Sequence, residues 1–239
     1  MVNLLDPNEV ISRMFESGKF ADMFNYCSKI LEKNPKDLMA LQNSALSLLH
    51  LEKFSESIEF CDKVLSDNEF DNYALTIKIH ALENLSKHEE VLNCCKSLLE
   101  KNKDDTWALN SKGLALNELN RYKEASEIFD IVLKIDTKNI TALINKALSM
   151  SFLGNHLKSI ECYDQAQKIN PLMKELSIAK SREFEKLGLE DEAFLSAQGV
   201  LLEDLEKIKS DANKNKCSVF HQFCQNEYEE KKNQSYKLK

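Results

Sequence analysis

Apolar residues recur along this chain at a fixed interval of 34 positions. Alanine followed by leucine returns four times with this spacing, at 40–41, 74–75, 108–109 and 142–143. Within one interval the apolar positions lie three or four residues apart, in two stripes separated by a short polar stretch, Asn117 to Arg121 in the fourth. The pattern therefore predicts two amphipathic helices per interval and a chain built from repeats.

The repeat runs through six units without insertion or deletion. Another column of large apolar residues passes through all six: Met14, Leu48, Leu82, Leu116, Met150 and Phe184. We place the units at residues 4–37, 38–71, 72–105, 106–139, 140–173 and 174–207. For residues 208–239 we expect an extension of the last helix to Lys209, a polar break at 210–216, a capping helix from Cys217 to about Glu230, and a frayed tail.

Small residues and prolines occupy set columns of the repeat. The first helices carry Ala45, Gly113, Ala147 and Ser181 in one column, the second helices carry Ser57, Ala125, Ser159 and Ala193 in another, and Pro35 and Pro171 close two units. This signature resembles the tetratricopeptide repeat family over about 200 of the 239 residues. Bulky Ile11, Ile79, Met23 and Val91 depart from it in units one and three. The resemblance implies an all-α, right-handed α-solenoid of six helix pairs, here with a C-terminal capping helix.

The resemblance also implies that the first helix of each pair lines a concave groove, which would include Asn43, Leu46, His50, Tyr73 and His80. In units four and five, large apolar residues fall in the groove columns beside amides that suit a peptide backbone. The predicted peptide-binding residues are Trp107, Asn110, Leu114, Ile144, Asn145, Leu148 and Phe152. The alternative is that Trp107 packs against the preceding pair and Ile144 belongs to the core.

Two functions follow from this surface. The first is a protein–protein interaction module that binds a peptide or a partner helix in the groove. The second is a self-associating scaffold, a homodimer formed through the groove or through a terminal segment with Val219, Phe220 and Phe223. Some family members grip a terminal carboxylate with basic residues, but the matching columns here hold no Lys or Arg. A chaperone-tail adaptor of that kind is therefore disfavoured.

Charge and cysteine content limit the classes of partner and the compartment that the sequence predicts. The net charge of −7 disfavours nucleic acid, and no stretch is apolar enough for a membrane-spanning helix. The first residues lack a secretion signal, and seven cysteines fit reduced thiols, so we expect a cytoplasmic protein. Cys27, Cys61 and Cys95 share one column and are expected in the core.

No catalytic motif is visible, so we expect no enzyme, no cofactor and no metal. The one pattern of metal-ligand type is Cys217, His221 and Cys224, which share a helical face and could hold zinc. The same face, with Phe220 and Tyr228, is also the apolar stripe expected of a capping helix, and we favour that interpretation.

Overall fold

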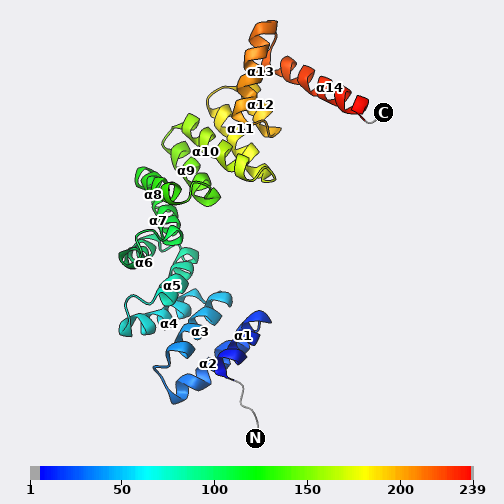
Figure 1. The fold of residues 1–239 in the computed structure, drawn as a ribbon. Helices are drawn as coiled ribbons and strands as arrows, with labels where there is room; N and C mark the ends of the chain where they lie inside the picture. Colours follow the sequence, from blue (N-terminus) through cyan, green and yellow to red (C-terminus); the bar gives the residue numbers. More distant parts are fainter. Residues whose placement is uncertain (1–5, 238–239) are drawn as a thin grey trace. The chain divides into compact units, whose positions relative to one another are not determined.

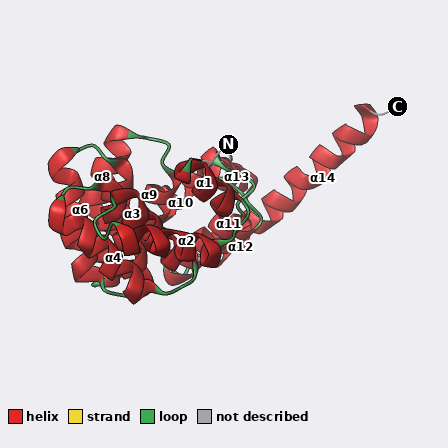
Figure 2. Ribbon diagram, turned by 90° about the horizontal axis from the view of Figure 1, so that it is seen from below, coloured by secondary structure: helices red, strands yellow, loops and turns green. Residues whose placement is uncertain are grey.

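The protein is all α-helical over the part of the chain that its structure describes. The computed structural model describes the backbone of residues 6–237, and the side chains through Glu227 and at Glu229. Helices are joined by short loops (Figures 1 and 2). Their bounds are α1 (Pro7–Glu16), α2 (Phe20–Lys33), α3 (Leu38–His50), α4 (Phe54–Asp67), α5 (Asn72–Asn84), α6 (His88–Lys101), α7 (Thr106–Glu118), α8 (Tyr122–Ile135), α9 (Ile140–Phe152), α10 (His156–Ile169), α11 (Lys174–Lys186), α12 (Glu190–Ala197), α13 (Leu202–Asn215) and α14 (Val219–Lys237).

The chain divides into two compact units, Met1–Arg121 and Tyr122–Lys239. Each helix packs against the next from α1 to α7 in the first unit, and from α8 to α12 in the second. Each unit is thus a stack of consecutive helices, and the boundary between the units falls inside the fourth pair, between α7 and α8. This stacking is the all-α solenoid that the repeat predicts. The expected start of the first repeat, residues 4 and 5, lies outside the described residues.

The 34-residue repeat is visible in the helix starts. The side chains of Asp37, Asp71, Asp105 and Asn139 each accept a hydrogen bond of 2.8–3.0 Å from the backbone N–H of the column alanine, three residues on. Such caps satisfy an N–H group that the first helical turn leaves without a partner. The alanine column therefore marks the first turn of these four first helices, α3, α5, α7 and α9.

The turn inside each pair also follows the repeat. Residues 18, 52, 86, 120, 154 and 188 all have φ between 56° and 75°. In every pair the N–H of this residue and the next N–H bond back to carbonyls three and five residues earlier, as Gly154 does to Ser151 and Asn155 to Met150. This is the Schellman arrangement, and it closes the first helix in the left-handed backbone region that glycine adopts without strain.

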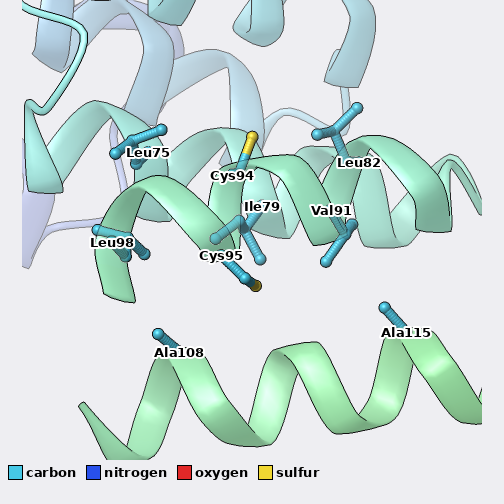
Figure 3. Close-up of a cluster of buried hydrophobic side chains, with 9 residues drawn as sticks. All are labelled: Leu75, Ile79, Leu82, Val91, Cys94, Cys95, Leu98, Ala108 and Ala115. Carbon is cyan, nitrogen blue, oxygen red and sulfur yellow. The ribbon is translucent and has the colours of Figure 1, made fainter. Parts of the chain in front are cut away.

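The cores lie between successive pairs. Figure 3 shows the cluster around α5, α6 and α7, where Ile79, Leu82 and Val91 are fully buried. Adjacent Cys94 and Cys95 point in opposite directions there. Cys27, Cys61 and Cys95 are each 0% exposed, which confirms their expected place in the core. Burial raises the pKa of the Cys27 thiol to about 11 and that of Cys61 to about 12, so these thiols stay protonated at neutral pH.

The C-terminal end differs from the sequence prediction. We expected the last helix to extend to Lys209, with a polar break at 210–216, and both expectations are wrong. Helix α12 ends at Ala197, and Ser210 lies inside α13. Gly199, at φ 91°, forms the turn that ends this shorter helix. Helix propensity along the sequence did not predict a turn at this position.

A helix is present where the sequence predicts a capping helix, and it is longer than predicted. The sequence placed it from Cys217 to about Glu230, whereas α14 runs from Val219 to Lys237. Val219 and Phe223 pack against the core cluster around Leu195, Leu205 and Ile208. The rest of α14 extends away from the other helices of its unit (Figure 2). The last two residues of the expected tail lie outside the described part.

Candidate functional site

The N-terminal unit is hollowed on the face of its first three first helices. A hollow of about 270 Å³ lies between α1, α3 and α5, and it is lined by Ile11, Ser12, Phe15, Glu16, Asn43, Leu46 and Tyr73. Phe15 and Tyr73 are 42% and 45% exposed, so both leave aromatic surface uncovered. Because α3 and α5 are in contact, successive first helices share this face.

The hollow contains residues that the sequence placed on the groove and others that it did not. Asn43, Leu46 and Tyr73 were expected there, and all three line it. Ile11, Phe15 and Glu16 were not considered as binding residues. A signal was available, because Phe15 and Glu16 stand 34 residues before Leu49 and His50, which the repeat assigns to the same face.

An aromatic stack holds the end of α3 beside this hollow. The ring of His50 stacks on that of Phe20 at 4.2 Å between centroids, and Phe15 meets both rings edge-on. Phe20 opens α2 directly after the left-handed turn. The stack therefore joins the turn of one pair to the end of the next pair's first helix and fixes Phe15 at the edge of the hollow.

Helix α7 carries three of the predicted binding residues. Trp107 is partly buried: it packs against the core cluster of α5 and α6, and its ring lies 5.3 Å from that of His80. Asn110 is also partly buried. Leu114 is 37% exposed. This packing favours the alternative interpretation of Trp107, in which the ring packs against the preceding helix pair.

Helix α9, in the second unit, carries the other four. Ile144 is partly buried against the cluster of Leu143, Tyr163 and Leu176, as its alternative interpretation requires. Asn145 is partly buried. Leu148 and Phe152 are 40% and 66% exposed, and the Phe152 ring stacks on Tyr122 at 4.6 Å. Tyr122 and Phe152 are spaced as Phe20 and His50 are, so the same stack occurs in both units.

A polar cluster includes residues that flank Phe152 in the sequence, Ser151 and His156. The buried carboxylate of Glu183 accepts hydrogen bonds of 2.7 Å from Lys186 and 2.8 Å from the Ser151 hydroxyl, and lies 2.8 Å from His156 Nδ1. Burial alone would raise the pKa of Glu183, but these partners outweigh it and hold the pKa below its ordinary value. The carboxylate is therefore ionised at neutral pH and ties α9, α10 and α11 together.

Of the candidate zinc ligands, Cys217 lies just before α14 and therefore not on the helical face that the sequence predicted, whereas His221 and Cys224 lie on α14. Cys217 Sγ lies 3.6 Å from Gln222 Oε1, and His221 Nε2 lies 3.0 Å from Gln225. Phe220 meets Phe194 of α12 edge-on at 5.3 Å. Among the side chains that the structure describes, no three His, Cys, Asp or Glu groups come together as a metal site. The side chain of Tyr228 lies outside that part.

None of the described helices is both long enough and apolar enough to cross a membrane.

Two family models match the sequence. The model of the N-terminal tetratricopeptide repeat region of Psidin matches residues 9–104, and a general tetratricopeptide repeat model matches residues 140–171. The chain is a tetratricopeptide repeat protein. Proteins built from these repeats generally mediate protein–protein interactions, and neither matching model is that of an enzyme. No curated protein matches the sequence.

Solved structures, two of them described as those of tetratricopeptide repeat proteins, have the same fold. One from Parabacteroides merdae has a TM-score of 0.71 and 19% identity, over 85% of this chain and 78% of that one. MamA from Desulfovibrio magneticus has a TM-score of 0.66 and 15% identity, over 70% of this chain and 94% of that one. YrrB, described as having an unusual peptide-binding site, has a TM-score of 0.60 and 13% identity, over 72% of this chain and 89% of that one. At these identities the similarity concerns the fold alone.

Proposed function

We propose that this tetratricopeptide repeat protein is an interaction module that binds a peptide or a partner helix on the face of its first helices. The observation that carries the proposal is the hollow between α1, α3 and α5, with the half-exposed rings of Phe15 and Tyr73 at its sides. Aromatic groups that are fixed by packing and open on one side are typical anchors of protein interfaces. The peptide-binding site described for YrrB supports the same use of this fold.

The predicted residues of α7 and α9 take three roles in this proposal. Leu114, Leu148 and Phe152 remain exposed and offer apolar surface to a partner. Asn110 and Asn145 supply donors and acceptors for its backbone. Trp107 and Ile144 each pack against a core cluster of their own unit and support α7 and α9 there.

Affinity capture with the full-length protein tests the proposal. Tyr73→Ala and Phe152→Ala should each reduce capture of a partner several-fold, because each removes an exposed ring from a first helix. Leu157→Ser is the matched control, because Leu157 is 62% exposed but lies on a second helix, α10. Circular dichroism should show unchanged helicity in all three variants. Capture that is reduced equally by the control, or by none of the variants, would overturn the proposal.

The alternative function is a self-associating scaffold. It is favoured by Phe194 and Phe220, which meet at the C-terminal end of the helix stack and are each 45% exposed. Light scattering distinguishes the two functions when the full chain is compared with a chain that stops at Cys217. This truncation separates α14 from α13, whereas a stop at Lys209 would cut α13. A dimer that is lost on truncation supports the scaffold, and a monomer in both forms excludes it.

A further inference from the structure

The hollow between α1, α3 and α5 contains apolar side chains and an acidic one, but no basic one. Ile11, Phe15, Leu46 and Tyr73 give it apolar surface. The chain has 32 lysines and arginines, yet none of those that the structure describes lines this hollow. Among the described residues of the lining, Glu16 is the one with a charged side chain. The hollow therefore combines apolar surface with negative charge.

The carboxylate of Glu16 has no cationic partner within the described part of the chain. Glu16 is exposed, and the basic residue of the same helix, Arg13, pairs at 2.6 Å with Glu9 instead. Glu16 is also the last residue of α1, where the helix dipole disfavours a negative charge. A cation that a partner brings to this position would therefore be stabilised by the carboxylate and by the helix end together.

The amide of Asn43 adds a hydrogen-bond acceptor to the same lining. Its Nδ2 donates to the carbonyl of Met39 at 2.8 Å, and the reverse orientation of the amide would set two oxygens against each other. Its Oδ1 accepts no hydrogen bond from the described residues and is not fully buried. The hollow thus offers acceptors to an occupant, and lysine and arginine are the side chains that carry several donors and no acceptor.

The acidic character continues at the ends of the following first helices. Glu83, in the last turn of α5, occupies the repeat column of Phe15. Glu118, the last residue of α7, occupies that of Glu16. Glu118 is exposed and, like Glu16, forms no ion pair with the described residues. The repeat therefore gives this face of the first unit a negative charge at more than one helix end.

The basic residues of the same helices lie in other columns or in existing contacts. Lys78 of α5 pairs with Asp62 of α4, and Lys112 of α7 occupies the same column one repeat later. His50 is held in the aromatic stack beside the hollow, and His80 lies 3.6 Å from the carboxylate at the end of α5. Above the pH range in which histidine titrates, the groove columns of α3, α5 and α7 thus contain no cation.

We propose that this hollow binds a basic segment of a partner protein, in which a lysine or arginine lies against Glu16 and an apolar side chain packs on Phe15 and Tyr73. The basic side chain supplies donors to the carboxylate and to the oxygen of Asn43. The inference rests on the proposed function, because it uses the same hollow, and it adds the charge of the partner. A neutral or acidic partner would leave the Glu16 carboxylate without a cation.

NMR titration of the ¹⁵N-labelled full-length protein, above the pH range in which histidine titrates, tests this inference with three synthetic peptides. The first is acetyl-Gly-Ser-Leu-Lys-Ser-Phe-Lys-Gly-amide, and the other two have Gln or Glu in place of both Lys residues. We expect the Lys peptide to shift the backbone amides of Glu16 and Tyr73 and the side-chain amide of Asn43. It should bind more tightly than the Gln peptide, and the Glu peptide should bind most weakly. Added salt should reduce the difference, because it screens exposed charges.

Substitutions separate the charge from the apolar surface. Glu16→Gln should weaken binding of the Lys peptide about two- to fivefold, the range of an exposed ion pair, and leave the Gln peptide unaffected. Glu59→Gln is the matched control, because it removes an exposed acid of α4 that does not line the hollow, so the Lys peptide should bind it normally. Tyr73→Ala should weaken all three peptides, because it removes apolar surface that each of them covers.

The outcomes distinguish this inference from the proposed function. Equal binding of the three peptides, all weakened by Tyr73→Ala, would overturn the inference and leave the hollow as a binding site. The inference also fails if Glu59→Gln weakens the Lys peptide as much as Glu16→Gln does, or if none of the peptides shifts the resonances of the hollow. Normal binding of the Lys peptide to Tyr73→Ala would instead contradict the proposed function.

Discussion

At the scale of single residues, the turn inside each helix pair imposes one backbone conformation on six different positions. Glycine occupies it at 18, 154 and 188, whereas Glu52, Ser86 and Asn120 adopt the same positive φ. A side chain on such a residue costs roughly 1–2 kcal/mol, and asparagine tolerates the conformation better than glutamate or serine does. Units two and three therefore contain a local strain that the glycine-containing units avoid.

Substitution at these turns should change stability in opposite directions. Glu52→Gly and Ser86→Gly should each raise the free energy of unfolding by about 0.5–1 kcal/mol, because the relief of strain exceeds the added freedom of the unfolded chain. Gly154→Ala should lower it by about 1–2 kcal/mol. Apart from its own chain neighbours, no atom would lie within 4 Å of a Cβ at Gly154, so this loss comes from the backbone conformation. Urea denaturation measures all three, and a lower midpoint for Ser86→Gly would refute the explanation.

At the scale of helices, ion pairs join one pair to the next at a repeated position. Asp62 with Lys78, Asp130 with Lys146 and Asp164 with Lys180 each connect a second helix to the following first helix, sixteen residues on. The first two pairs are partly exposed and the third is buried. The corresponding positions on α6 and α7 are Lys96 and Lys112, two like charges. The series is interrupted there.

Restoring the missing pair should stabilise the junction of α6 and α7. We expect Lys96→Asp to raise the free energy of unfolding by about 0.2–1 kcal/mol, the range of exposed ion pairs. Lys96→Asn removes the repulsion without adding attraction, so it should give a smaller increase. Urea denaturation at low and high salt separates the contributions, because salt screens the new attraction. Equal stability of the Asp and Asn variants would show that the two positions do not form a pair.

At the scale of the whole molecule, the chain consists of two compact units, and each contains its own buried clusters. The single tryptophan, Trp107, lies in the first unit and packs against the cluster around Ile79. The buried pair of Asp164 and Lys180 lies in the second. Because interactions in repeat proteins are mainly between neighbours, a change in one unit should act mostly on that unit.

Tryptophan fluorescence and far-UV circular dichroism should therefore respond differently to substitutions in the two units. Lys180→Met leaves Asp164 buried without its partner and should destabilise the second unit by about 3–5 kcal/mol, which lowers the circular dichroism midpoint in urea. The Trp107 transition should hardly move. Ile79→Ala, a core truncation in the first unit that costs about 2–5 kcal/mol, should shift it strongly. Equal shifts of the Trp107 transition in both variants would mean that the chain unfolds as one cooperative unit.

The sequence by itself determined the fold class and most helix positions, because the repeat places the same caps, turns and apolar columns every 34 residues. Local interactions such as the cap of Asp71 on Ala74 need only neighbouring residues, so the pattern is sufficient to predict them. The core positions of Cys27, Cys61 and Cys95 followed in the same way. The groove residues Asn43, Leu46 and Tyr73 were also readable from their columns.

The tertiary structure alone decided what happens where the repeat is broken and which large side chains are buried. Gly199 ends α12 early because contacts from Gln167, Lys180 and Asp164, on other helices, fix the segment that follows. No periodicity within α12 carries that information. Likewise Trp107 and Leu114 stand on the same helix, but only packing against α5 and α6 shows that Trp107 is half inside the core while Leu114 is exposed. Burial depends on the neighbouring pairs, which the pattern of one helix does not contain.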